Sequence, residues 1–446
     1  MRIARRTPTD SALSMRFILP VIGENLLTIT IGLVFSQIIS GISSSALAAI
    51  GMANTVQNFV FALFSMITTG ASVLVARRIG EGRGVEAAGV VEQASFLSVA
   101  FSAAVAALCF LFASPILRLL MPGAEDALFG EAVAYFRILM LSLPFYALHS
   151  VLSAIFRAAG NGKTPMRIAL IMNMAQLAAG FLFISVLHLE EIGAGLAYVL
   201  CRLVGAGLML YSLLHYHTHF VVHLRGMLRF RADVCRHVLS IGAPNSIEAV
   251  FVQMGYMIAN SMSIALGTFE AGVYQILNTF NTFVALPQNV TLVAALPIAG
   301  QLIGAGKPEE ARRTGRKLWA AAIGATVVLC AFLMLFATPL VSIYSSDSAT
   351  IASAASMTWL LLVLNVPAAS INCIDPQLRA GGDGRQVMFN ALGTVWLIRL
   401  PLTYLFCFVW DMGVSGIFLG NTAALVVRAS FSFARHCGSK WLVHKV

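Results

Sequence analysis

The sequence predicts an all-α integral membrane protein with twelve transmembrane helices in two six-helix lobes. Three observations predict it: an apolar composition, basic residues confined to alternate loops, and an internal repeat. Hydrophobic residues make up 59% of the chain and charged residues 11%, with a mean hydropathy of +0.85. Soluble domains carry roughly 25% charged residues. Most of this chain is therefore expected to lie in lipid.

A helix that crosses the bilayer core needs about 20 apolar residues. Charge-poor runs of about this length occur at 17–41, 46–75, 93–117, 131–156, 168–188, 193–214, 239–265, 271–300, 318–342, 351–375, 387–409 and 413–434. No small-residue cleavage pattern follows the arginines at the N-terminus, so the first run is predicted to be a retained helix rather than a signal peptide.

The loops between these runs differ in charge. Five alternate loops hold most of the arginines and lysines: Arg77, Arg78, Arg83, Arg157, Lys163, Arg167, Arg225, Arg229, Arg231, Arg236, Lys307, Arg312, Arg313, Arg316, Lys317, Arg379 and Arg385. The intervening loops carry acids instead. Basic loops stay on the cytoplasmic side, so both termini are predicted to be cytoplasmic in a multi-pass protein of a bacterial inner (cytoplasmic) membrane. The net charge of +10 follows from this topology, and no nucleic-acid partner is expected.

The chain also repeats itself. A shift of 224 positions aligns Pro20 with Pro244 and Glu24 with Glu248, and it places Gly80-Glu-Gly-Arg83 on Gly304-Ala-Gly-Lys307. A shift of 222 places Arg157-Ala-Ala-Gly-Asn-Gly-Lys163 on Arg379-Ala-Gly-Gly-Asp-Gly-Arg385. Six spans per copy make the repeats parallel, an arrangement in which transporters hold substrate between the halves.

The repeat sets the predicted domains. They are a cytoplasmic N-terminal segment (1–16), an N-lobe (17–214), a basic and polar cytoplasmic linker (215–238), a C-lobe (239–434) and a cytoplasmic C-terminal tail (435–446).

Several segments together resemble the multidrug and toxic compound extrusion (MATE) family, in particular its DinF-like branch. They are Leu19-Pro20, Glu24-Asn-Leu-Leu27, Ala46-Leu-Ala-Ala-Ile-Gly51, Gly80-Glu-Gly82, Arg157-Ala-Ala-Gly-Asn-Gly-Lys-Thr-Pro-Met166, Gly242-Ala-Pro244, Arg379-Ala-Gly-Gly-Asp383 and Ile398-Arg-Leu-Pro401. Their order, spacing and duplication carry the resemblance along the whole chain.

The resemblance implies two lobes arranged as a V that open alternately to either side of the membrane. It implies an antiporter that exports small amphipathic, cationic organic compounds or drugs against entry of protons or sodium ions. Family members usually carry an aspartate about fifteen residues after the first proline, where this sequence has Phe35. Ion coupling is therefore expected first in the C-lobe. The protein is expected to act as a monomer without a cofactor.

Three acids within spans are the ion-coupling candidates: Glu24, Glu248 and Asp375. A carboxylate at membrane depth is costly unless it is paired, protonated or wet, so it is a functional candidate. Each glutamate follows a proline by one helical turn, where a freed backbone carbonyl can help to hold a proton or a sodium ion. The alternative is a structural carboxyl that bonds a neighbouring helix.

Asp375 lies four residues before Arg379 and could form an ordinary helix-end pair with it. Arg399 also lies within a span, and Glu248 or Asp375 is its expected charge partner. The spans hold three further bases, Arg137, Arg202 and Arg428. Four bases against three acids do not by themselves predict an anionic cavity, so cationic substrates rest on the resemblance alone.

Amide side chains within spans are candidates for lining the substrate cavity: Asn25, Gln37, Asn54, Asn173, Gln176, Asn245, Gln253, Asn278 and Asn281. Hydrogen bonding between helices is the alternative role for such residues.

The remaining reactive residues form no evident site. Seven cysteines are scattered without paired spacing, which indicates neither disulfides nor zinc. A histidine tract at 215–223 could bind a transition metal, but an exposed loop is the favoured interpretation because no second cluster completes a site. No metal is predicted.

Two other functions compete with the exporter. A flippase of lipid-linked intermediates is the close rival, although two additional helices would be expected. A membrane enzyme is disfavoured because among the histidines only His149 lies centrally in a span, and intramembrane chemistry needs clustered catalytic groups. A channel would not need duplicated, proline-broken helices.

Overall fold

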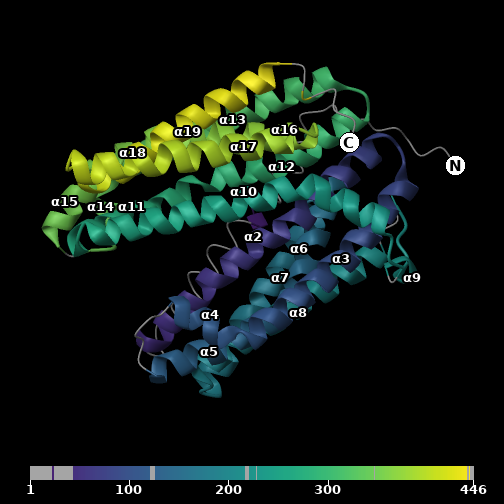
Figure 1. Ribbon diagram of the computed structural model, residues 1–446, viewed down its shortest axis with the longest axis horizontal. Coiled ribbons are helices and arrows are strands. Elements are labelled where there is room, and N and C mark those ends of the chain that lie inside the picture. Colours follow the sequence, from purple (N-terminus) through teal and green to yellow (C-terminus); the bar gives the residue numbers. More distant parts are fainter. Residues whose placement is uncertain are drawn as a thin grey trace. The chain divides into compact units, whose positions relative to one another are not determined.

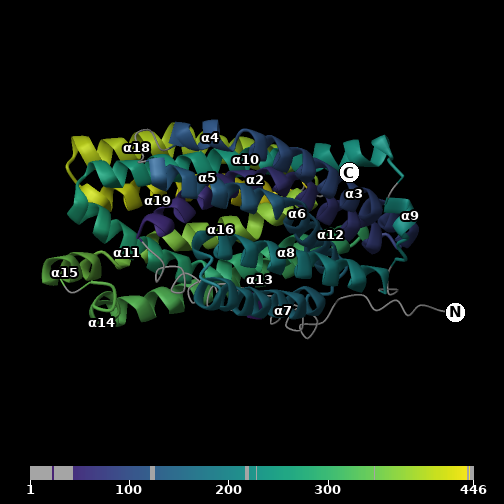
Figure 2. The same ribbon diagram turned by 90° about the horizontal axis from the view of Figure 1, so that it is seen from below.

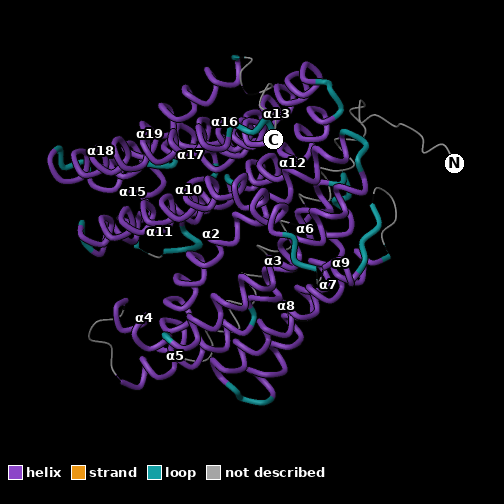
Figure 3. Tube along the Cα trace, turned by 45° about the vertical axis from the view of Figure 1, so that its right-hand side comes forward, coloured by secondary structure: helices purple, strands orange, loops and turns teal. Residues whose placement is uncertain are grey.

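The computed structural model describes residues 23–24, 44–120, 126–215, 220–227, 229–345, 347–438 and 441. Within these ranges the chain consists of helices joined by short loops, and no strand occurs in them (Figure 3). The first predicted span, 17–41, lies outside the described residues apart from Gly23 and Glu24.

The other eleven predicted spans coincide with helices or with helices broken once or more. In the N-terminal half these are α2 (Ser44–Gly80), α3 (Gly84–Leu111), α4 (Ala113–Leu120), α5 (Asp126–Leu141), α6 (Leu143–Ala158), α7 (Lys163–Gly180), the π-helical turn η1 (Phe181–Val186), α8 (Glu190–Leu214) and the short α9 (Leu224–Met227).

The C-terminal half repeats this order with more breaks. It contains α10 (Ala232–Ala265), α11 (Thr268–Val284), α12 (Leu286–Gly304), α13 (Pro308–Leu335), α14 (Ala337–Val341), α15 (Ser348–Ser356), α16 (Trp359–Ala380), α17 (Gly384–Gly393), η2 (Thr394–Arg399), α18 (Leu400–Tyr404), η3 (Leu405–Val409) and α19 (Gly413–Cys437).

By length and composition, the described residues contain nine helices able to cross a membrane. The count becomes ten when α5 and α6, which are bent by 45° at their junction, form one broken span. The predicted multi-pass, all-helical architecture is confirmed.

The chain divides into two compact units. Unit 1 comprises Met1–Ala53 and Val99–His217, and unit 2 comprises Asn54–Ser98 and Thr218–Val446. Most of α2 and the first half of α3 therefore group with the C-terminal half.

Within unit 1, α8 is the central helix and packs against α5, α6 and α7 (Figure 1). Small residues permit this packing. A Cβ atom on Gly195 would lie 2.9 Å from Cγ2 of Ile138 on α5, and one on Gly205 would lie 2.7 Å from Sδ of Met172 on α7.

Within unit 2, α16 is the central helix and packs against α12, α13 and α19, while α10 packs along α17 (Figures 1 and 2). A cluster of buried apolar side chains from α10, α11, α13, α14, α15, α16, η3 and α19 fills one part of it. The polar residues described below lie outside this apolar cluster.

The duplication extends to backbone conformation. Gly82 and Gly306 occupy the left-handed region with φ of 75° and 72°, and Gly160 and Gly382 do so with 80° and 93°. These pairs are equivalent at the 224 and 222 shifts. Since L-residues with a side chain rarely adopt this conformation, the glycines end their helices in tight turns.

Glycines also bring helices of unit 2 into backbone contact. A Cβ on Gly80 would overlap the carbonyl oxygen of Gln301, and one on Gly304 would overlap that of Arg77. These two contacts are related by the 224 shift, so α2 and α12 cross each other at equivalent points of the repeat.

Gly242 of α10 has the tightest of these contacts, because its Cβ would overlap the carbonyl oxygen of Met66 on α2. We expect Gly242→Ala to lower the free energy of unfolding by about 1–3 kcal/mol, the usual cost of overpacking. Thermal unfolding in detergent measures it. Gly324→Ala is the control, because nothing lies within 4 Å of its Cβ position. Equal midpoint temperatures of unfolding for Gly242→Ala and Gly324→Ala would contradict the close packing of α10 against α2.

Candidate functional site

Two of the predicted acids meet in unit 2, where they share one arginine. Nη2 of Arg428 on α19 donates to Oε1 of Glu248 on α10 at 2.6 Å and to Oδ2 of Asp375 on α16 at 2.7 Å. Nη2 of Arg379, at the end of α16, donates to the other oxygen of Glu248 at 2.7 Å. We call these four residues the Arg428 cluster.

Local sequence explains how the acids reach this position. Pro244 lies within α10 one turn before Glu248, and Pro376 lies within α16 directly after Asp375. Proline removes a backbone hydrogen bond at each point and relaxes the helix there. Because α16 packs against α19, Asp375 can lie opposite Arg428, to which it is bonded.

The cluster is buried and balanced in charge. Asp375 is 2% exposed, Glu248 7% and Arg428 9%. Two carboxylates face two guanidinium groups, so the net charge is zero. Oδ1 of Asp375 and the Nε atoms of both arginines have no hydrogen-bond partner. The network therefore keeps unused donors and an unused acceptor, which allow a second arrangement of the same groups.

Glu24 forms an equivalent pair in unit 1. Nη1 of Arg157 donates to Oε1 of Glu24 at 3.3 Å. Glu24 and Glu248 are equivalent at the 224 shift, and Arg157 and Arg379 at the 222 shift. The repeat thus conserves one glutamate–arginine pair in each half.

The structure corrects the expected charge partners. Arg399 bonds neither Glu248 nor Asp375; its guanidinium lies over the Tyr256 ring, 4.3 Å from the centroid. Asp375 pairs with Arg428 instead of its helix neighbour Arg379, which reaches across to Glu248. The partners depend on which faces of α10, α16 and α19 meet, and spacing along one helix does not define these faces.

The described amide candidates take different roles. In unit 2, Asn245 donates to Oγ of Ser65 at 3.0 Å, and Asn281 accepts from Nδ2 of Asn365 at 2.8 Å. Asn54 and Gln253 are half-buried, and Asn278 is exposed. In unit 1, Gln176 accepts from the thiol of Cys201 at 3.6 Å, and Asn173 is buried with Nδ2 unpartnered.

Asn25 and Gln37, together with Phe35, lie outside the described residues.

Sequence reasoning missed an amide network in unit 2. Gln288 of α12 donates to Asn365 at 2.8 Å and accepts from Asn372 at 3.2 Å, and Asn365 in turn donates to Asn281. Gln288 and Asn365 are almost fully buried. Sequence reasoning also missed the pairing roles of Arg157, Arg379 and Arg428. The repeat could have indicated the roles of Arg157 and Arg379, because both these arginines and the glutamates that they bond are duplicated.

The histidine tract shows no metal site in the part of the chain that is described. His215 is exposed and lies against Tyr211 on its own helix, 4.3 Å between ring centroids. The described residues contain no group of three or more histidine, cysteine or acidic side chains suited to a metal ion.

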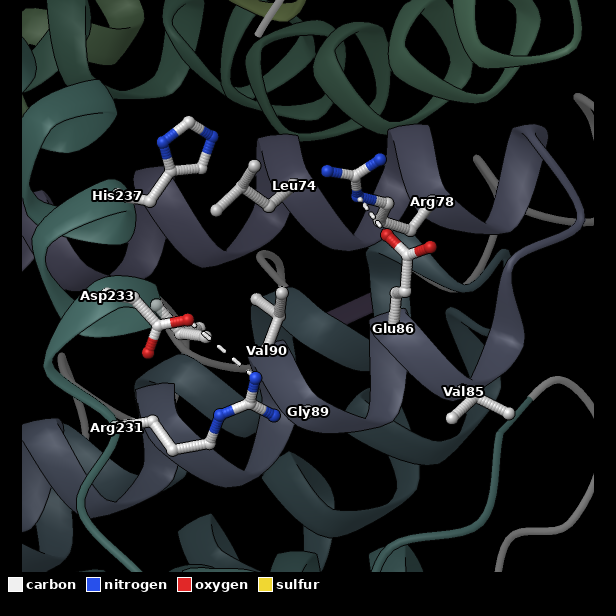
Figure 4. A pocket seen from close by; sticks show the side chains of 10 residues that line it. Leu74, Arg78, Val85, Glu86, Gly89, Val90, Arg231, Asp233 and His237 are labelled. Carbon is white, nitrogen blue, oxygen red and sulfur yellow. Dashed lines mark ion pairs between the residues drawn. The ribbon is translucent and has the colours of Figure 1, made fainter.

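A cavity of about 470 Å³ lies near the turn between α2 and α3, beside the start of α10 (Figure 4). Leu74 and Val90 lie at its apolar side, and its charged groups are paired: Arg78 with Glu86 at 3.3 Å and Arg231 with Asp233 at 3.7 Å. His237 in its lining precedes Glu248 by eleven residues, about 16 Å along a helix. None of the predicted coupling acids lines it.

With the fold and the charged clusters defined, comparison with known proteins decides the family. The sequence matches MatE over residues 20–207 and 244–405, one match in each repeat. The chain belongs to the MatE family.

This MatE protein is 24% identical over 432 residues to the probable multidrug resistance protein NorM of Thermotoga maritima, covering 96% of this chain and 92% of that one. It is 22% identical over 431 residues to the multidrug resistance protein MdtK of Pectobacterium atrosepticum, covering 93% of each chain.

Its fold is similar to that of a multidrug resistance MATE family transporter of the MOP superfamily in an outward-facing conformation. The TM-score is 0.90 at 20% sequence identity, covering 97% of this chain and 96% of that chain. This MatE protein is therefore a multi-pass membrane transporter and not an enzyme.

The Arg428 cluster predicts a thermodynamic signature. We expect Arg428→Gln to lower the free energy of unfolding by about 3–5 kcal/mol, since it leaves a buried carboxylate without its counter-charge. Adding Asp375→Asn should recover at least half of the loss because the uncompensated charge is then removed. Thermal unfolding in detergent measures both variants.

Arg83→Gln is the control, since Arg83 is exposed and its ion pairs lie at the surface. A double variant no more stable than Arg428→Gln alone would show that Asp375 and Arg428 are not coupled.

Proposed function

We propose that the chain is a secondary active exporter of small amphipathic organic compounds, driven by proton entry across a bacterial cytoplasmic membrane. Its membership of a transporter family and its repeated halves support transport by alternating access. The relatives named as multidrug resistance proteins support an organic substrate.

The observation that carries proton coupling is the position of Arg428 between Glu248 and Asp375. A bound sodium ion needs several oxygen ligands and supplies positive charge to carboxylates. Here a guanidinium already supplies that charge, and the best-placed oxygens of both acids accept its N–H groups. This arrangement supports a proton as the coupling ion over sodium.

A proton can act on this cluster by changing its ion pairs. Protonation of Glu248 or Asp375 cancels one negative charge and weakens one bond to Arg428. The guanidinium can then shift toward the remaining carboxylate. Such an exchange gives the cluster two arrangements with different proton content, and a ligand that prefers one of them shifts the population. Helices α10, α16 and α19 move with the groups they carry.

We assign proton coupling first to Glu248 and Asp375, with Arg428 and Arg379 as their charge partners. Glu24 has an equivalent arginine partner, Arg157. Among the described residues of unit 1, no second acid forms an ion pair with Arg157. The contribution of Glu24 is therefore proposed to be smaller. The half-buried amides Asn245 and Asn281 are proposed to line the substrate path.

Proteoliposomes with an imposed pH or sodium gradient test this proposal, with ethidium as the transported probe. We expect wild-type uptake to follow the pH gradient and not the sodium gradient. Glu248→Gln and Asp375→Asn should each slow uptake by about tenfold or more, because the exchangeable proton is lost. Glu24→Gln should slow it less. Glu309→Gln, at an exposed acid, is the control and should match wild type.

Uptake driven only by sodium would contradict proton coupling. Full activity of both Glu248→Gln and Asp375→Asn would overturn the assignment to these acids, and uptake independent of any gradient would rule out secondary transport.

A further inference from the structure

Unit 1 contains a half-buried arginine that pairs with no carboxylate among the residues the structure describes. Arg202 of α8 lies between two aromatic rings, 5.1 Å from the centroid of Tyr146 and 4.7 Å from that of Tyr198. Its Nη2 donates to Oη of Tyr198 at 2.8 Å, and its Nε has no partner. Among the described residues of unit 1, the ion pair that forms is Glu24 with Arg157, and it does not include Arg202.

Three more buried polar atoms without hydrogen-bond partners lie on the helices around Arg202. They are Nε2 of His149 and Oγ of Ser153 on α6, and Nδ2 of Asn173 on α7. These residues are 8%, 3% and 4% exposed, respectively. Buried polar groups are nearly always paired, so four unpartnered atoms in one three-helix interface need an explanation.

Contacts between α6, α7 and α8 place the helical turn that holds Arg202 against His149 and Met172. Tyr146, His149 and Ser153 recur at helical spacing on one face of α6. A Cβ on Gly205, one turn after Arg202, would lie 3.2 Å from Cδ2 of His149 and 2.7 Å from Sδ of Met172. Met172 precedes Asn173 and lies 3.9 Å from Nη1 of Arg202. We call Arg202, His149, Ser153, Asn173 and the two tyrosines the Arg202 cluster.

The repeat shows what this cluster lacks. The sixth helix of each half carries an arginine, the half-buried Arg202 on α8 and the buried Arg428 on α19. In the C-terminal half Asp375 neutralises the arginine. At the 222 shift the residue equivalent to Asp375 is Ser153. At the same shift Arg428 is equivalent to Ala206, so the arginine of the N-terminal half lies about one helical turn away from the equivalent position. This half therefore has a half-buried cation on its sixth helix and a neutral hydroxyl where the other half has its acid.

The chemistry of the cluster selects an anion. Guanidinium and amide N–H groups only donate, and a hydroxyl and an imidazole can donate. A buried charge without a counter-ion is unfavourable by several kcal/mol. One guanidinium matches one negative charge, which favours a carboxylate over a doubly charged phosphate. The tyrosine rings beside it can contact an apolar body.

We infer that the Arg202 cluster binds the carboxylate of a transported organic compound. This inference rests on the proposed function and names the substrate class: amphipathic compounds that carry a carboxylate. Arg202 lies twelve residues from the start of α8 at Glu190, about 18 Å along the helix. That depth is near the bilayer midplane, where transporters with repeated halves hold their substrates.

A matched pair of ligands tests the inference: N-dansyl-phenylalanine and its methyl ester, which differ only in the carboxylate. Equilibrium binding to the purified full-length protein in detergent is measured by dansyl fluorescence. We expect wild type to bind the acid about tenfold or more tightly than the ester. Arg202→Gln should reduce acid affinity to that of the ester without changing ester affinity. Arg202→Lys should retain part of the preference.

Asn173→Ala provides a second test if Arg202→Gln does not fold, and it should weaken acid binding several-fold with no effect on the ester. Arg137→Gln is the matched control, since Arg137 also lies over an aromatic ring, that of Phe110 at 5.5 Å, but is exposed. It should keep the wild-type preference.

Equal affinities of wild type for acid and ester would overturn the inference, as would an undiminished preference in a folded Arg202→Gln or Asn173→Ala variant. Binding in detergent requires no gradient. If ethidium uptake follows a gradient but wild type binds the acid and the ester equally tightly, this inference alone is overturned. If wild type prefers the acid but no uptake follows a gradient, only the proposed function is overturned.

Discussion

The bonds from Arg428 to Glu248 and Asp375 hold the charged centre of unit 2 together. They join α10, α16 and α19 through buried charges, each of which would be unfavourable alone at this depth. Arg379 completes the balance at Glu248. Because the charges cancel only as a set, a change in the protonation of one acid alters the bonds of the whole cluster. The cluster therefore connects proton occupancy to the packing of three helices.

The duplicated scaffold is used differently in its two halves. Each half keeps a glutamate–arginine pair at equivalent positions, Glu24 with Arg157 and Glu248 with Arg379. The C-terminal half adds the Asp375–Arg428 pair, whereas the N-terminal half has Ser153 in the place of the aspartate, and Arg202 pairs with no acid among its described residues. In our proposals the first half binds the substrate anion and the second exchanges the proton.

Much of the fold could be predicted from sequence because it depends on local patterns. Apolar runs locate the helices from residue 44 onward, and the duplicated glycine segments coincide with turns in which Gly82 and Gly306 adopt the left-handed conformation. The depth of Glu248 and Asp375 also follows from their positions within runs. These properties need only spacing along one segment.

The charge partners could not be predicted because they depend on contacts between segments far apart in sequence. Arg399 and Arg428 both lie in apolar runs of the C-terminal half, and nothing local distinguishes them. The packing of α19 against α16 brings Arg428 to Asp375, whereas Arg399, at the end of η2, lies over the Tyr256 ring of α10. The amide network around Gln288 depends in the same way on how α11, α12 and α16 pack.

Infrared difference spectroscopy of the purified protein between alkaline and acidic buffer detects protonation of carboxyl groups and so tests proton exchange at Glu248 and Asp375. We expect a protonated-carboxyl band that appears on acidification and is lost or shifted in Glu248→Gln or Asp375→Asn. A spectrum in which neither substitution changes that band, but in which added sodium shifts the carboxylate bands of both residues, would contradict it.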